Sequence, residues 1–167
     1  MPTRLMCTLA AVVVLAGCAS APPAPVAITT ETFMIPAADP GIQLHVRNKR
    51  PAGQDRFAPE RIVLLVHGAT YPSEPGFDIP LPGGSWLDRL AGRGFDVYAV
   101  DVRGYGRSTR PASMSQPVAS NPPFADTQDT VRDVGAAVDF IPTHRGVAKI
   151  NVPTLLILGE WDQETTP

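Results

Sequence analysis

The most constraining feature of the sequence is the stretch Arg61–Thr70, in which an unbroken apolar run is followed directly by His-Gly-Ala-Thr. Residues Ile62 to Val66 are all apolar, and the run is bounded by Pro59 and Gly68. Such a run is typical of a strand that is buried on both faces, as in a parallel sheet covered by helices. Open α/β sheets bind their ligands at the carboxyl ends of their strands. The sequence therefore predicts an α/β fold with a site in the residues that follow this strand.

The chain before and after this run is predicted to add strands and a helix to the same sheet. Apolar and polar residues alternate over Ile42–Arg47, which predicts a half-exposed strand with His45 on its polar side. A turn at Asp39-Pro40-Gly41 would pair it with Ile28–Pro36 in an antiparallel hairpin at the sheet edge. A strand at 62–66, a helix at 85–91 capped by Ser85 and a strand at 95–101 predict a right-handed parallel crossover.

Two later segments complete the predicted secondary structure. Residues 71–84 contain four prolines and three glycines, which predicts a long irregular loop. An amphipathic helix is predicted over 126–141, with its N-cap among residues 126–129 and its end at Pro142. Its apolar face is predicted to consist of Val131, Val134, Val138 and Ile141. A last strand is predicted over Thr154–Leu158.

The N-terminal segment has the pattern of an export signal. Arg4 is followed by an apolar run from Leu5 to Ala16, which is too short to span a bilayer stably. The next residues complete Leu-Ala-Gly-Cys, which resembles the lipobox of bacterial lipoproteins and predicts lipidation at Cys18. Ordinary signal-peptidase cleavage after Ala19 or Ala21 is the alternative. We therefore predict a signal peptide over 1–18, a Pro/Ala-rich tether over 19–27 and one domain over 28–167.

Charge and cysteine content narrow the possible functions. A net charge of −2 over 167 residues gives no indication of a nucleic-acid partner. The two cysteines, Cys7 and Cys18, both lie in the N-terminal segment, so no disulfide or thiol chemistry is predicted for the mature domain.

Three motifs, taken in order, resemble those of the α/β-hydrolase family. They are His67-Gly68 after the buried strand, Asp101–Ser108 after the next strand, and Val152–Asp162. The resemblance covers roughly residues 28–150 and resumes at Val152. It implies an α/β-hydrolase-like, mostly parallel sheet that is incomplete, consisting of the N-terminal half and one late strand.

The resemblance also implies roles for individual residues. In this family a backbone N–H from the loop after the third strand contributes to the oxyanion hole, which corresponds here to Ala69, with Thr70 as its neighbour. Asp162 matches the acid that orients the catalytic histidine. The family uses a serine nucleophile without a metal or organic cofactor. Structural roles in holding the loops are implied for His67, Gly68, Asp101, Arg103, Gly104 and Gly106.

The sequence departs from the family in two of the three triad members. No Gly-x-Ser-x-Gly elbow is present: the stretches around Ser85 and Ser108 lack the final glycine. The family order Ser, acid, His requires a histidine after Asp162, whereas His144 precedes it. We therefore predict no triad catalysis for the chain as given.

The junction at Asn151-Val152 indicates where the missing part would have been. Residues 147–151 resemble the approach to the fifth strand, yet they join directly to the approach of a much later strand. A true deletion, a frameshifted gene or a mis-assembled sequence would each explain this. We predict that Thr154–Leu158 takes the vacant position beside Val63–Val66, which would place Trp161 where the nucleophile belongs.

The sequence as a whole predicts an exported protein of the cell envelope that is lipid-anchored and faces the periplasm. It would be a truncated pseudoenzyme of a family that hydrolyses ester or amide bonds in small molecules. The alternative is a non-enzymatic lipoprotein that binds a small apolar ligand between the loops of His67 and Gly104. Its predicted partners are a small molecule and, through the anchor, the membrane.

Overall fold

The computed structural model describes residues 25–117, 119 and 124–148. The predictions for Cys18, Thr154–Leu158 and Asp162 lie outside these residues, as do those for the signal peptide and most of the tether. Within the described residues, none of the helices is both long enough and apolar enough to cross a membrane.

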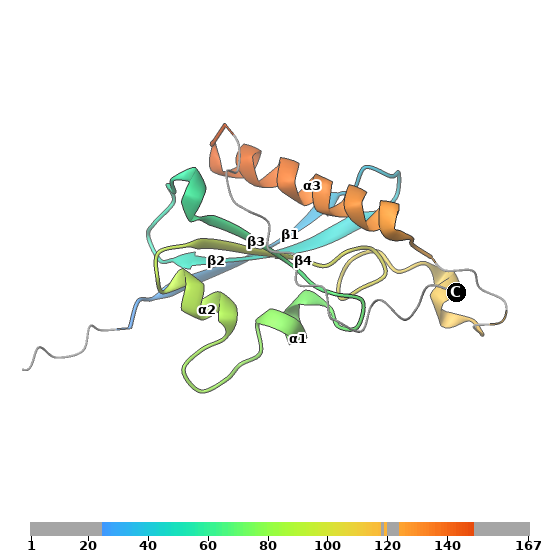
Figure 1. The fold of residues 1–167 in the computed structure, drawn as a ribbon, viewed down its shortest axis with the longest axis horizontal. Helices are drawn as coiled ribbons and strands as arrows, with labels where there is room; N and C mark the ends of the chain where they lie inside the picture. Colours follow the sequence, from blue (N-terminus) through green and yellow to red (C-terminus); the bar gives the residue numbers. More distant parts are fainter. Residues whose placement is uncertain (1–24, 118, 120–123, 149–167) are drawn as a thin grey trace, which may run out of the picture.

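The described strands form one mixed sheet (Figure 1). Its strands are β1 (Ile28–Pro36), β2 (Gln43–Pro51), β3 (Ile62–Val66) and β4 (Asp96–Val100), in the spatial order β1-β2-β4-β3. The pairs β1–β2 and β2–β4 are antiparallel, and β3–β4 is parallel. The predicted hairpin and the predicted parallel crossover are both confirmed, and so is the α/β class.

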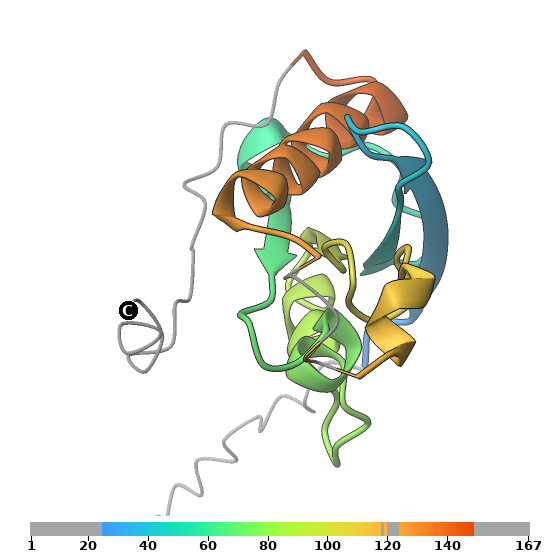
Figure 2. The same cartoon turned by 90° about the vertical axis from the view of Figure 1, so that its right-hand side faces the viewer.

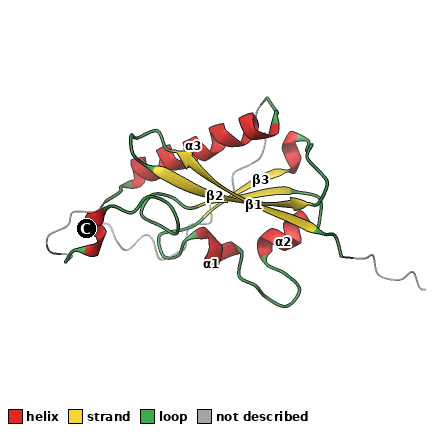
Figure 3. Ribbon diagram, turned by 180° about the vertical axis from the view of Figure 1, so that it is seen from behind, coloured by secondary structure: helices red, strands yellow, loops and turns green. Residues whose placement is uncertain are grey.

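Helices cover both faces of this sheet. The long helix α3 (Thr127–Arg145) lies on one face, and α1 (Ser73–Phe77) and α2 (Trp86–Ala91) lie on the other (Figures 1 and 2). Side chains of β4 alternate between two cores: Tyr98 and Val100 pack on the α3 side, whereas Val97 and Ala99 pack with α2. Because all five β4 residues are buried, this strand is the centre of the fold. Two short 3-10 helices, η1 (Pro59–Arg61) and η2 (Ala112–Ser115), lie in the connections (Figure 3).

The prediction of a half-exposed second strand was wrong. Eight of the nine β2 residues are buried or half-buried, because β2 lies between β1 and β4 with helices on both sides. Its polar side chains are buried with partners from distant segments: His45 contacts Asp101, and Lys49 donates to Asp78. Alternation of polarity therefore reflected paired polar groups, not exposure to solvent.

The prediction of an irregular loop over 71–84 was incomplete. The five-residue helix α1 includes Pro75 and Gly76. Proline is tolerated there because the N–H groups of a first helical turn have no acceptor within the helix. Ser85 caps α2 as predicted: its hydroxyl accepts from the N–H of Asp88, whose carboxylate accepts from the N–H of Ser85.

Helix α3 differs from the prediction in its buried face and in its end. The residues buried most deeply are Asp133, Ala137 and Ile141, whereas Val131 and Val138 are exposed. The helix also continues one turn beyond Pro142, to Arg145.

Contacts of the last turn explain why α3 does not end at the proline. The Arg145 guanidinium donates to Asp96 at 2.6 Å, and His144 packs against Phe33 with ring centroids 4.7 Å apart. These contacts offset the hydrogen bond that proline cannot donate. Gly146 then ends the helix in the left-handed region with φ of 65°, where glycine is favoured.

Candidate functional site

The loops that follow β3 and β4 meet at the carboxyl edge of the parallel pair, and His67 joins them. Its Nε2 accepts from the N–H of Val102 at 3.1 Å. Because Nε2 is the acceptor, Nδ1 carries the proton and donates to the carbonyl of Gly68 at 2.7 Å. His67 is 7% exposed, and its hydrogen bond with Val102 holds the two loops together.

Tyr105 makes a second link between these loops. Its hydroxyl donates to the carbonyl of Ala69, and its ring packs on the imidazole of His67 with centroids 4.7 Å apart. Ala69 and Thr70 are exposed, and within the described residues no acceptor is recorded for either backbone N–H. The predicted oxyanion donor thus lies in a fixed loop that faces solvent.

Asp101 anchors the start of the β4 loop, which is the loop of residues 101–108 that follows β4. Its carboxylate accepts from His45 Nδ1 at 3.0 Å, from the N–H of Ser73 at 2.8 Å and from the N–H of Arg107 at 3.3 Å. Burial alone would raise the pKa of this carboxyl, but these hydrogen bonds outweigh burial and lower the pKa to about 2. The group is therefore an ionised structural anchor at neutral pH, since a proton is held only under strongly acidic conditions.

Gly106 is required by this anchor. It adopts φ of 49°, and a Cβ atom at this position would lie 2.1 Å from Oδ2 of Asp101. The hydroxyl of Ser108 closes the same turn by donating to the Asp101 carbonyl and accepting from the N–H of His45 at 2.8 Å.

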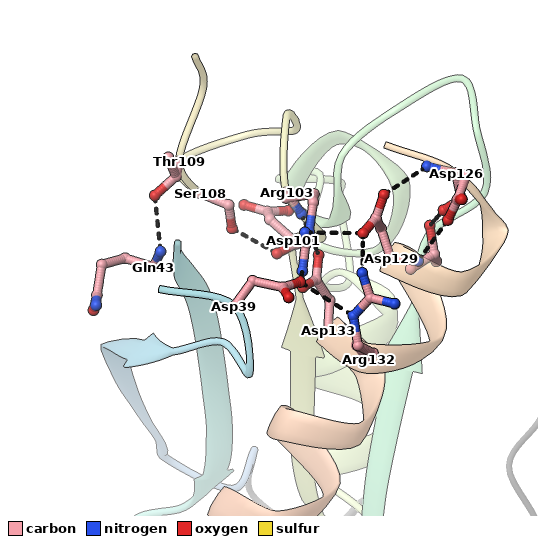
Figure 4. A network of polar contacts seen from close by, with 11 residues as sticks. Asp39, Gln43, Asp101, Arg103, Ser108, Thr109, Asp126, Asp129, Arg132 and Asp133 are labelled. Atoms are coloured by element: carbon pink, nitrogen blue, oxygen red, sulfur yellow. Dashed lines mark hydrogen bonds and ion pairs between the residues drawn. The ribbon is translucent and has the colours of Figure 1, made fainter. Parts of the chain in front are cut away.

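Arg103 ties the β4 loop to α3 and to the β1–β2 turn (Figure 4). Its guanidinium pairs with Asp133 at 2.7 Å, with Asp129 at 3.1 Å and with Asp39 at 2.5 Å. The hydrogen bond to Asp133 is the main cause of the raised pKa of Arg103. Asp133 is fully buried, so its ion pair with Arg103 holds α3 in place beside the β4 loop.

His45 and Asp101 form a histidine–carboxylate pair that the sequence did not predict. Such a pair resembles the base and acid of a triad, but His45 is only 5% exposed. Its Nε2 is buried without a recorded partner among the described residues, so a substrate has no access to it. The pair is structural. The polar residues of β2 could have indicated a buried pair. The partner of His45, however, lies 56 positions away in the sequence.

Both serines that come nearest to an elbow sequence are buried and engaged. Ser85, 2% exposed, caps α2 and donates to Asp78. Ser108 is 4% exposed and is bonded within the β4 loop. Neither presents a hydroxyl to Ala69. Among the described residues, no group of three or more His, Cys, Asp and Glu side chains is placed to hold a metal ion.

Comparison with known proteins gives the family of this arrangement. The sequence profile of the alpha/beta hydrolase family matches residues 63–164, more than half of the chain. The chain belongs to the alpha/beta hydrolase family. The α/β-hydrolase-like, incomplete fold predicted from the sequence is confirmed, and the matched range includes the loops that carry His67 and Asp101.

Solved structures with a similar fold share little sequence with this hydrolase-family chain. A hypothetical protein from Pseudomonas aeruginosa has 21% identity and a TM-score of 0.46, over 79% of this chain and 35% of that one. An acetyl xylan esterase from Paenibacillus sp. R4 has 17% identity and a TM-score of 0.41, over 78% and 46%. A protein described as a predicted CIB-like hydrolase from Thermoplasma acidophilum has 18% identity and a TM-score of 0.41, over 75% of this chain and 50% of that one.

The chain spans between 35% and 50% of the length of these three structures. No curated protein matches the sequence. The family assignment depends on the profile match over residues 63–164.

Proposed function

We propose that the described part of the chain carries the oxyanion-binding half of an α/β-hydrolase site, and that these 167 residues do not by themselves perform triad catalysis. The reaction class in question is hydrolysis of an ester or amide bond. A backbone N–H at Ala69 would stabilise the negative charge that develops on the carbonyl oxygen, a contribution of about 10²- to 10³-fold in rate for one such donor.

The observation that supports this proposal is the fixed loop at Ala69. His67 and Tyr105 hold the carbonyls on either side of the Ala69 N–H, and within the described residues that N–H has no acceptor. We expect no nucleophile beside it, because the sequence contains no Gly-x-Ser-x-Gly and Ser85 and Ser108, which come nearest to that pattern, are buried.

An esterase assay tests the proposal. We expect the purified mature protein to hydrolyse an activated ester such as p-nitrophenyl acetate no faster than heat-denatured protein at the same concentration. Saturable turnover that disappears in Asp162→Ala would overturn it, because Asp162 would then serve in a working triad.

We also propose that the protein is exported to the cell envelope and anchored through lipid on Cys18. The Leu-Ala-Gly-Cys motif behind the apolar run supports this proposal. In a bacterial host, Cys18→Ser should shift the protein from the membrane fraction to the soluble fraction and remove the mass of the lipid. Unchanged fractionation and mass in the variant would refute it.

The alternative is a lipoprotein that binds a small apolar ligand without turnover. The space between the His67 and Gly104 loops is occupied by the contact of His67 with Tyr105, so a ligand needs another place. A groove of about 510 Å³ between the end of β1 and α3, lined mainly by apolar side chains such as Ile35, Ala136 and Phe140, supports this alternative. A rise in melting temperature with a fatty acid, lost in Ala136→Trp, would favour it over the hydrolase proposal.

A further inference from the structure

The geometry points to Tyr105 as a positioning residue that orients the Ala69–Thr70 peptide, so that two successive N–H groups face one small anion such as a carboxylate. This inference rests on the proposed function, because it concerns the same loop. It extends that function from one donor at Ala69 to a pair of donors, and it assigns their orientation to a side chain of the β4 loop.

The first of the two N–H groups is oriented by His67. Its Nδ1–H donates to the Gly68 carbonyl at 2.7 Å, so this carbonyl points toward the imidazole. The described residues contain no cis peptide, and in a planar trans peptide the N–H points opposite to the C=O. The N–H of Ala69 therefore points away from the imidazole and from the β4 loop behind it.

The second N–H group is oriented by Tyr105. Its hydroxyl donates to the carbonyl of Ala69, so the same rule directs the N–H of Thr70 away from the tyrosine. Because the Tyr105 ring packs on the His67 ring at 4.7 Å, the two carbonyls are turned toward one pair of rings. The chain bends over residues 69–71, as it must for successive carbonyls to face one side. Successive N–H groups on one side of a bend form a concave site for anions.

Tyr105 is itself held firmly enough to perform this role. Its N–H donates to the Val102 carbonyl at 3.1 Å, and its carbonyl accepts from the N–H of Ser108 at 3.0 Å. The preceding carbonyl, that of Gly104, accepts from Arg110 at 2.8 Å. The hydroxyl is thus presented by a turn that is bonded on both sides. Among the described residues, His67 and Tyr105 are the side chains that bind the carbonyls of Gly68 and Ala69.

Loss of the hydroxyl would release one peptide and leave the fold intact. Without a donor on the Ala69 carbonyl, the Ala69–Thr70 peptide can rotate and direct its carbonyl toward the anion. One hydrogen bond has a net value that corresponds to about 2- to 10-fold in affinity. We expect Tyr105→Phe to weaken anion binding by this factor, since it keeps the ring that packs on His67.

A titration followed by ¹H–¹⁵N NMR tests the inference on the full chain. Sodium formate is added to the wild type, to Tyr105→Phe and to Tyr71→Phe, with sodium chloride at equal ionic strength as the reference. Tyr71 is 66% exposed and lies two residues from Ala69. Its variant therefore also removes a tyrosine hydroxyl, but it keeps the bond of Tyr105 to the Ala69 carbonyl. We expect saturable shifts of the Ala69 and Thr70 amides with formate in the wild type and in Tyr71→Phe, and weakened binding in Tyr105→Phe.

The outcomes separate this inference from the proposed function. Equal formate affinity in the wild type and in Tyr105→Phe would overturn the role of Tyr105 and leave the oxyanion-binding loop standing. A wild type whose two amides respond to formate no more than to chloride would overturn the proposed function as well. A purely structural role would change the melting temperature of Tyr105→Phe without changing its formate affinity, which also counts against the inference.

Discussion

Replacement of Gly106 by alanine tests how tightly the β4 loop closes around Asp101. A Cβ atom at this position would lie 2.1 Å from Oδ2 and 2.5 Å from Cγ of Asp101. No side chain tolerates such a contact, so the carboxylate must move. Its bonds to His45 and to the N–H of Arg107, both made by Oδ2, would then be lost.

Two contributions give the expected magnitude. The left-handed conformation of Gly106, with φ of 49°, costs an alanine about 1–2 kcal/mol. The lowering of the pKa of Asp101 from 3.8 to about 2 corresponds to about 2 kcal/mol in the free energy of unfolding. The two Oδ2 bonds supply only a part of this, because the N–H of Ser73 still donates to Oδ1. Gly106→Ala should therefore destabilise the chain by about 2–4 kcal/mol, a large part of the stability of a small domain.

Gly41 provides the matched control. It lies in the β1–β2 turn with φ of 79°, and a Cβ atom there would meet nothing within 4 Å. Gly41→Ala should thus show only the backbone cost of about 1–2 kcal/mol. Urea unfolding followed by far-ultraviolet circular dichroism at pH 7 measures both variants.

The comparison of the two glycines is decisive. A chain that unfolds with Gly106→Ala and stays folded with Gly41→Ala agrees with the reasoning. Equal losses of stability in the two variants would refute it, because the Asp101 carboxylate would then have moved without cost.

Three further predictions concern other contacts. The pKa of Asp101 is about 2 in the folded chain and 3.8 ordinarily, so its contribution to stability is complete above pH 4 and is lost as the pH falls toward 2. Urea midpoints should fall over this pH range in the wild type, and Asp101→Asn should abolish this pH dependence. Arg103→Met leaves the buried Asp133 carboxylate without its cationic partner and should cost about 3–5 kcal/mol in calorimetry. Arg107→Met should cost under about 1 kcal/mol, because the Arg107 side chain is 59% exposed in its pair with Glu74; similar losses in the two variants would contradict this. If the segment around Leu156 pairs with β3, Leu156→Pro should speed amide hydrogen exchange at β3, and unchanged exchange would exclude the pairing.

Features that depend on neighbouring residues could be predicted from the sequence. Strand β3 has the predicted bounds, Ile62–Val66. Five consecutive apolar residues form a buried strand without a specific partner far away in the sequence. Ser85 caps α2, and Asp126 caps α3 with Asp129 three residues on. Each of these depends on a hydrogen bond or a pattern that spans a few positions.

Features that depend on partners far away in the sequence could not be predicted. Asn48 is fully buried because Asp96, 48 positions away, accepts from its amide at 2.7 Å. Asp133 faces the sheet because Arg103 pairs with it from 30 positions away. In both cases an isolated polar residue indicates solvent, and only the fold supplies the partner that reverses this.

The candidate site shows the same division. The position of Ala69 follows from the motif around His67, whereas the hydroxyl of Tyr105 reaches Ala69 across 36 positions. No local pattern indicates that a tyrosine in a glycine-rich turn will orient a peptide in another loop. The residue type is recognisable as part of a motif, but its contact is a property of the folded chain.

Three consecutive residues hold this site from different sides. Asp101 binds His45 in β2 and the start of α1, the N–H of Val102 binds His67 after β3, and Arg103 binds α3 and the β1–β2 turn. Every one of these partners lies within the described residues. Contacts with β2, β3, α3 and the start of α1 therefore hold the residues that support the loop at Ala69. The pair of backbone donors that we propose at Ala69 and Thr70 would therefore be oriented by β2, β3 and β4, and would not need the segment that carries the nucleophile in this family.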